Sequence, residues 1–268
     1  MTKHILTIQD LSCVGRCSLT VALPVLSAMG HRCSVLPTAV LSTHTAFPKP
    51  EVADLTDRLL SFSRHWQENG ITFDAVTVGY LSDPRQAEIV EQILQNIGAP
   101  VVLDPVMGDH GRLYSRITEE HILAMKRLAA RADVILPNLT EAAALTGLPY
   151  REQVDEAYLK DLTDGLLALG AKAAVITGVH LQDGAIGYYG RNREASPFCY
   201  QGRLIPRQFH GTGDLFAAVL SGSLLRGFSL EAAAKKAAEF VAACVENTEK
   251  VTPFGVEFER QLYKLWKA

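Results

Sequence analysis

The sequence predicts a single α/β domain over residues 1–268, in which helices cover both faces of a mostly parallel central sheet in three α/β/α layers. Three observations lead to this fold class. Short β-rich segments alternate with longer helical patterns from one end of the chain to the other. Apolar residues make up 48% of the 268 residues, which is enough to build one large core. No linker, repeat or low-complexity stretch separates two domains.

Hydrophobic periodicity and turn residues place the elements in chain order. Strands of the parallel part are expected at 4–8, 33–36, 75–78, 101–103, 134–136 and 173–177. Helices are expected between them at 18–29, 52–68, 85–96, 119–130, 141–146 and 153–169. Residues 185–189 and 196–201 predict a hairpin that extends one edge of the sheet in the antiparallel direction. Three helices are expected to end the chain, at 214–226, 230–247 and 257–266.

Charge and cysteine content narrow the classes of function. A net charge of -3 leaves no basic excess, so nucleic acid is not an expected partner. The five cysteines are scattered and odd in number, which favours reduced thiols in a cytoplasmic protein over a disulfide framework. No apolar run reaches the roughly 18 residues that cross a bilayer, and the first residues lack a signal-peptide pattern. We therefore expect no association with a membrane.

The stretch Gly211-Thr212-Gly213-Asp214, directly before an apolar helical segment, is the most informative motif. Glycine lets the backbone approach a ligand closely, and the first N–H groups of a helix have no partner inside it. Together with the helix dipole, these groups suit a phosphate, and Asp214 beside them is a candidate base. The alternative is an ordinary helix start in which Asp214 is a capping residue.

Polar residues also follow most of the predicted strands. In an open parallel sheet, ligands bind beyond the carboxyl ends of the strands, so these residues are candidates for one common site. In chain order they are Asp10, Ser12, His44, Thr45, Tyr80, Asp104, Asn138, Glu141, Thr177 and Gly178.

Read in order, these residues resemble the pyridoxal and pyridoxamine kinase branch, the vitamin B6 kinases, of the ribokinase-like superfamily, and the resemblance covers nearly the whole chain. The stretch 211–214 resembles the anion-hole and catalytic-base motif of that family. The stretches 104–109 (DPVMGD) and 137–141 (PNLTE) resemble its other two markers. The stretch 41–45 (LSTHT), followed by a helix, looks like the B6 branch rather than the glycine motif and β-sheet lid of sugar kinases.

The resemblance implies an ATP-dependent transfer of phosphate to the 5'-hydroxymethyl group of pyridoxal, pyridoxine or pyridoxamine. It implies that Asp214 takes the proton of that group while the N–H groups of Gly211, Thr212 and Gly213 hold the phosphoryl group. The expected substrate-binding residues are Asp10, Ser12, His44, Thr45, Tyr80 and Asp214, and the resemblance implies that His44 and Thr45 line the pyridine ring. The implied contacts of ATP are Asp104, Asn138, Glu141, Thr177, Gly178 and the 211–213 loop. Asp104 and Glu141 are the expected Mg²⁺ ligands, a monovalent cation is compatible with the family, and a homodimer is implied.

One residue departs from the family pattern, because Asp10 stands where a serine is common. A carboxylate accepts a hydrogen bond from the ring hydroxyl, or pairs with a protonated ring nitrogen or an aminomethyl group. We therefore hypothesise that Asp10 gives the protein a preference for pyridoxamine. The alternative is that Asp10 only caps the turn that follows the first strand.

Simpler interpretations stay open for other residues and for the whole protein. Glu141 is also explained as an acidic residue in the first turn of a helix, Asp104 as part of a strand-end turn, and His44 as a loop histidine. Two rival functions remain: a hydroxymethylpyrimidine kinase of thiamin synthesis, which shares the fold and the late motifs, and a non-catalytic sensor of a vitamin or nucleotide.

Overall fold

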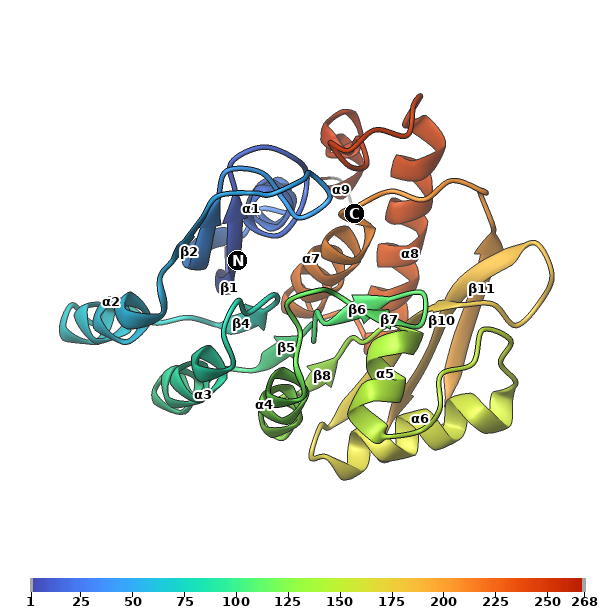
Figure 1. The fold of residues 1–268 in the computed structure, drawn as a ribbon, viewed down its shortest axis with the longest axis horizontal. Coiled ribbons are helices and arrows are strands. Elements are labelled where there is room, and N and C mark those ends of the chain that lie inside the picture. Colours follow the sequence, from blue (N-terminus) through green and yellow to red (C-terminus); the bar gives the residue numbers. More distant parts are fainter. Residues whose placement is uncertain (1, 267–268) are drawn as a thin grey trace.

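The computed structural model describes residues 2–266, which form a nine-stranded sheet between two layers of helices (Figure 1). The order across the sheet is β11-β10-β9-β8-β5-β4-β1-β2-β3. The strands are β1 (His4–Ser12), β2 (Arg32–Leu41), β3 (Val52–Asp54), β4 (Ala75–Val78), β5 (Val101–Leu103), β8 (Val134–Ile135), β9 (Ala173–Val179), β10 (Ala185–Asn192) and β11 (Phe198–Arg203). A separate two-stranded hairpin consists of β6 (Gly108–Asp109) and β7 (Arg112–Leu113).

The six strands from β9 to β2 are parallel to their neighbours, whereas β3, β10 and β11 pair in the antiparallel direction. The parallel strands therefore end along one edge of the sheet, where the loops after them meet.

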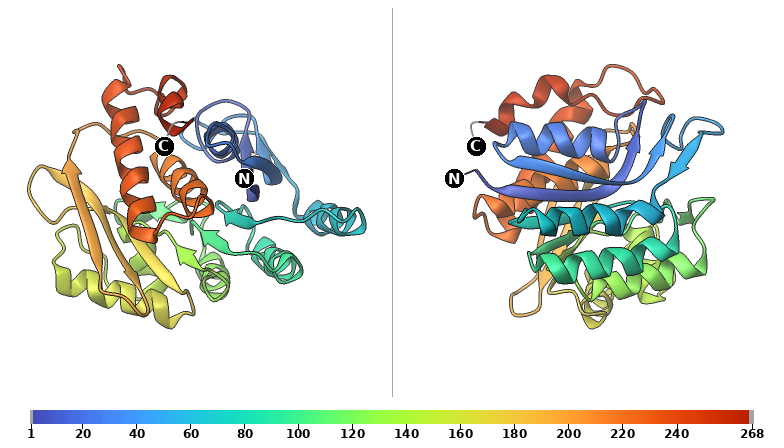
Figure 2. Two further views of the ribbon diagram at one scale, coloured as in Figure 1. Left: turned by 180° about the vertical axis from the view of Figure 1, so that it is seen from behind. Right: turned by 90° about the vertical axis from the view of Figure 1, so that its left-hand side faces the viewer.

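The helices divide between the two faces of the sheet, as the views from behind and from the side show (Figure 2). One face is covered by α1 (Leu19–Ala28), α7 (Thr212–Leu225), α8 (Leu230–Asn247) and the short α9 (Tyr263–Trp266), which follows the 3₁₀ turn η1 (Glu259–Gln261). The other face is covered by α2 (Thr56–Glu68), α3 (Pro84–Ile97), α4 (Glu119–Ala129), α5 (Leu139–Thr146) and α6 (Glu156–Ala168).

Successive side chains of each strand point to opposite faces of the sheet, which explains why there are two separate hydrophobic cores. Ile5 packs into the core beneath α1 and α7, whereas Leu6 and Ile8 pack into the core on the opposite face. All three side chains are fully buried. Since both faces are covered, the strands read as nearly continuous apolar runs, which is typical of parallel sheets.

The predicted three-layer fold with an antiparallel edge hairpin is confirmed, but the bounds of several predicted elements differ from those observed. The helix expected at 52–68 begins only at Thr56, because residues 52–54 pair with β2 as strand β3. Strand β2 itself runs five residues beyond the predicted end at 36.

The helix expected at 257–266 is broken into η1 and α9. The buried Val256 and Phe258 hold the chain against the core there, and the N–H of Val256 donates to the carbonyl of His210. Among residues 2–266, no helix is long and apolar enough to cross a membrane.

Candidate active site

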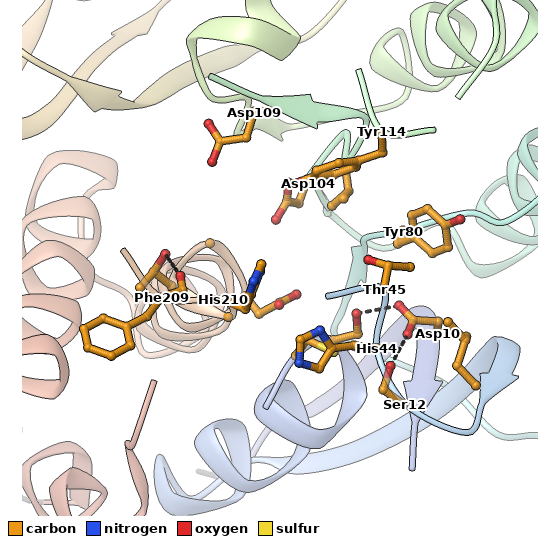
Figure 3. A pocket seen from close by; sticks show the side chains of 18 of the residues that line it. Asp10, Ser12, His44, Thr45, Tyr80, Asp104, Asp109, Tyr114, Phe209 and His210 are labelled. Carbon is orange, nitrogen blue, oxygen red and sulfur yellow. Dashed lines mark hydrogen bonds between the residues drawn. The ribbon is translucent and has the colours of Figure 1, made fainter. Parts of the chain in front are cut away.

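A cleft of about 530 Å³ lies beyond the carboxyl ends of the parallel strands (Figure 3). The loops after β1, β2, β4, β5 and β8, the end of β9 and the start of α7 supply its walls. The predicted site residues that line it are Asp10, Ser12, His44, Thr45, Tyr80, Asp104, Asn138, Glu141, Thr177, Gly211, Thr212, Gly213 and Asp214. Gly178 does not line it and is exposed; it has a φ of 69° and lies at a bulge, where the pairing of β9 with β10 passes from Thr177 directly to Val179.

The start of α7 projects into the cleft through the glycine loop. Gly211 is the N-cap residue with a φ of 88°, and a side chain there would meet the carbonyl oxygen of Arg16 at 2.2 Å. Gly213, in contrast, is exposed, and a Cβ atom there would meet no atom of another part of the chain within 4 Å. Gly211 is thus required by the fold, whereas Gly213 leaves free space beside the unpaired N–H groups at the helix start. Such a helix start suits an anion.

Asp214 lies in the first turn of α7, half-buried at the wall of the cleft. Burial raises its pKa from 3.8 to about 7; a hydrogen bond with the backbone of Ser18 lowers the pKa, and the charge of Asp10 raises it. A carboxyl group with such a pKa exchanges a proton readily near neutral pH, which is what general-base catalysis needs.

Asp10 also lines the cleft, and two serine hydroxyl groups hold its carboxylate (Figure 3). The Oγ of Ser12 donates to its Oδ2 at 3.1 Å, and the Oγ of Ser18 donates to its Oδ1 at 2.5 Å. Burial raises the pKa of Asp10, while the two hydroxyl groups lower it. The carboxylate therefore both organises the turn after β1 and faces the cleft, so the two interpretations of Asp10 are compatible.

His44, Thr45 and Tyr80 line the same part of the cleft (Figure 3). His44 is buried, its Nε2 hydrogen-bonds the carbonyl of Pro253 at 2.5 Å, and its Nδ1 accepts the N–H of Ala46 at 3.3 Å. Both ring nitrogens thus have protein partners, and the rings of Phe47 and His210 pack against His44 with centroid distances of 5.2 Å. Thr45 is exposed, and burial followed by the charge of Asp10 raises the pKa of Tyr80.

Asp104, Asn138 and Glu141 form the part of the cleft beyond β5 and β8. The Oε1 of Glu141 accepts the N–H of Met107 at 3.0 Å, and its Oε2 accepts the N–H of Asn138 at 2.9 Å. The side chain of Asn138 caps α5 at the N–H of Glu141 and donates to the carbonyl of Gly108 at 2.8 Å. Asn138 and Glu141 therefore fix the loop after β5, in addition to lining the cleft.

The electrostatics of this part of the cleft favour a cation. Burial, followed by the charges of Glu141 and Asp214, raises the pKa of Asp104 well above 3.8. Burial also raises the pKa of Glu141 to about 7, against the opposing effect of the backbone N–H groups. Residues 2–266 contain no group of three or more His, Cys, Asp or Glu side chains arranged for a metal ion.

Sequence reasoning missed several residues of the cleft. Cys17 and Ser18 reach it because the loop before α1 folds back between β1 and α7, and Lys49 and Arg116 contribute positive charge from two rim loops. Tyr114 enters from the segment after the β6–β7 hairpin, where burial raises its pKa (Figure 3). The loop residues carry no local signal, and the position of Ser18 at a helix start indicates a capping residue rather than a contact with the cleft.

The chain has the fold of a ribokinase-like α/β protein. Helices cover both faces of its sheet, a polar cleft lies at the carboxyl ends of the strands, and a glycine-rich helix start lies inside that cleft. Within this class, the chain belongs to the phosphomethylpyrimidine kinase family, whose model matches residues 23–256. The predicted resemblance to the pyridoxal kinase branch is confirmed by this match together with the similar proteins below.

Three similar proteins show that both phosphomethylpyrimidine kinases and pyridoxal kinases are among the relatives of this chain. The chain is 33% identical over 177 residues to the hydroxymethylpyrimidine/phosphomethylpyrimidine kinase of Streptomyces coelicolor; this match covers 65% of the chain and 64% of that protein. A Bacteroides thetaiotaomicron protein, provisionally assigned as a phosphomethylpyrimidine kinase and crystallised with pyridoxal, is 36% identical, with a TM-score of 0.93 and coverage of 99% and 96%. Pyridoxal kinase from Lactobacillus plantarum is 35% identical, with a TM-score of 0.91 and coverage of 99% and 97%.

Proposed function

We propose that the protein transfers the terminal phosphoryl group of ATP to the 5'-hydroxymethyl group of a vitamin B6 vitamer. The observation that carries this proposal is the position of Asp214, a carboxyl group with a pKa of about 7 beside the open helix start of α7. On one side lie polar groups for an acceptor, and on the other lie carboxyl groups for a metal–nucleotide complex.

Proton removal is the part of the reaction assigned to Asp214. The acceptor alcohol loses its proton as its oxygen attacks the phosphorus, and Asp214 accepts that proton in the same site. Asp10, Ser12, His44, Thr45 and Tyr80 would hold the ring so that the hydroxymethyl group points at Asp214. Alignment of this kind supplies much of the rate enhancement in phosphoryl transfer, because the reacting atoms need little further chemical help.

The start of α7 would stabilise the negative charge on the phosphoryl group during its transfer. The N–H groups of Gly211, Thr212 and Gly213 would donate hydrogen bonds to the phosphoryl oxygens, and the positive end of the helix dipole adds to this attraction. The absence of a side chain at Gly213 leaves the space in which these oxygens would lie. The remainder of ATP would extend along Asn138 and Thr177.

Magnesium fits the carboxyl groups beyond β5 and β8. Asp104 and Glu141 have raised pKa values because negative charge is unfavourable there, so a divalent cation would stabilise their ionised forms. When bound, Mg²⁺ would neutralise phosphate charge during transfer. Asp104 is the candidate for direct contact, and Glu141 would hold the loop that carries it.

Two observations favour vitamin B6 as the acceptor. The Bacteroides protein that resembles this chain over 99% of its length was crystallised with pyridoxal, and the Lactobacillus relative is a pyridoxal kinase. The runner-up is a hydroxymethylpyrimidine acceptor, which the family description and the Streptomyces relative favour. The chain spans less than two thirds of that relative, so the longer matches weigh more.

A direct assay separates these possibilities. The protein is incubated with ATP, Mg²⁺ and one of pyridoxal, pyridoxine, pyridoxamine or hydroxymethylpyrimidine, and the release of ADP is measured. The proposal predicts that at least one pyridine acceptor is used with higher kcat/KM than the pyrimidine. A strong preference for the pyrimidine would select the runner-up, and no ADP release with any acceptor would favour a sensor.

A further inference from the structure

Ser18 combines two features that are unfavourable when taken separately. Its backbone has a φ of 48° and a ψ of -126°, a conformation that side-chain-bearing residues rarely adopt. It is also the N-cap residue of α1, yet its side chain makes no capping hydrogen bond, although serine is among the best capping residues. Strain of this kind persists only where the surrounding structure holds it, and it is frequent beside functional groups.

Both features bring Ser18 into contact with the two carboxyl groups of the cleft wall. Its hydroxyl group, diverted from the helix, donates to the Oδ1 of Asp10 at 2.5 Å. Its backbone makes a hydrogen bond with Asp214. Ser18 is itself only 7% exposed, so water does not compete readily for these contacts. Ser12 holds the other oxygen of Asp10.

We propose that Ser18 is a positioning residue that fixes the acceptor-binding carboxylate of Asp10 and the base Asp214 in one geometry. This inference rests on the proposed function. If Asp10 holds the ring and Asp214 receives the proton of its hydroxymethyl group, the distance between the two carboxyl groups decides whether that hydroxyl reaches the base. Like charges on neighbouring carboxylates repel each other, and a misplacement of about 1 Å can cost roughly a hundredfold in rate.

Substitution of Ser18 by glycine separates positioning from a merely structural role. Glycine adopts a φ of 48° without strain and keeps the backbone N–H, so the change removes the hydroxyl group and relieves the backbone. We expect an unfolding temperature no lower than that of the wild type. We also expect kcat/KM for the acceptor to fall by about tenfold, the usual effect of losing a hydrogen bond to a charged group, while KM for ATP stays unchanged.

A double-mutant cycle tests whether Ser18 acts through Asp10. In an Asp10→Ala background, where the hydroxyl group has no carboxylate to hold, Ser18→Gly should change kcat/KM by less than about twofold. Thr20→Ala is the matched control, because Thr20 bonds to the carbonyls of Gly15 and Cys17 in the same loop and neither Asp10 nor Asp214 is among its partners. It should lower stability with little change in KM for the acceptor.

The measurements use whichever acceptor the wild type phosphorylates, with pyridoxal tried first. Near-wild-type kcat/KM for Ser18→Gly, or an equal loss with and without Asp10, overturns the positioning role. A wild type that phosphorylates only the pyrimidine refutes the B6 proposal, and the Ser18 variants are then judged with that substrate. A wild type that phosphorylates neither refutes both proposals.

Discussion

Replacement of Asp214 by asparagine is expected to stabilise the folded protein and to remove most of its activity. The carboxyl group has a pKa of about 7 in the folded protein, against an ordinary value of 3.8, chiefly because of burial. At about 1.4 kcal/mol for each pKa unit, keeping this group ionised costs on the order of 4 kcal/mol of folding free energy. The side chain borders an open cleft, so solvent screening reduces the expected gain to roughly 1 to 2 kcal/mol.

The sign of this effect fixes its dependence on pH. Because the folded pKa lies above the unfolded one, the stability contributed by the protonated group is fully present below about pH 4. It is lost as the pH rises through 7. Asparagine does not titrate, so the stability advantage of the variant should grow between pH 5 and pH 8. Thermal unfolding without ligands should show a gain of about 3 to 6 °C at pH 8.

Turnover should move in the opposite direction. Loss of a general base typically lowers kcat by about a hundredfold to ten-thousandfold, whereas binding of ATP should persist. Asp161→Asn, at an exposed position of α6, is the charge-matched control and should change neither quantity. If the Asp214 variant gains no stability at pH 8 relative to pH 5, the burial argument fails. If it keeps near-normal turnover, the assignment of the base fails.

Three further predictions concern the cleft. Gly213→Ala should leave the unfolding temperature nearly unchanged but raise KM for ATP. Gly211→Ala should lower the free energy of unfolding by more than about 1 kcal/mol in a denaturant titration, because its Cβ would meet a carbonyl oxygen at 2.2 Å. Glu141→Gln should weaken apparent Mg²⁺ affinity by about tenfold to a hundredfold, measured by titrating Mg²⁺ into the assay; unchanged affinity would remove this residue from the metal site. Asp10→Asn should raise KM for pyridoxamine by about tenfold and KM for pyridoxine less, and equal changes would argue against recognition of positive charge.

The parts of the fold that the sequence predicts well depend on local signals. The helix starts at Asn138 and at Gly211 carry capping residues and glycines that act within a few positions. The cleft was also predictable, because strands that run parallel end at the same edge. Helices of 14 residues or more, such as α3 and α8, are long enough for their hydrophobic periodicity to be recognised.

The parts that were missed depend on contacts between distant segments. Strand β3 has three residues and each strand of the β6–β7 hairpin has two, which is too short for a periodic pattern. They exist because a partner strand is already in place. Ser18 was missed for a related reason, since its backbone strain and its contact with Asp10 arise only after α1 packs against β1. The exposure of Gly178 likewise depends on the bulge that forms where β9 pairs with β10.

The most direct test of the central claim is a crystal structure of the protein with pyridoxal, Mg²⁺ and a non-hydrolysable ATP analogue. We expect the 5'-hydroxyl oxygen to lie within about 2.6 to 3.2 Å of the Asp214 carboxylate, with the terminal phosphate at the N–H groups of residues 211–213. A complex in which that oxygen is bound far from Asp214, with another side chain between it and the phosphate, would contradict the role of Asp214 as the base.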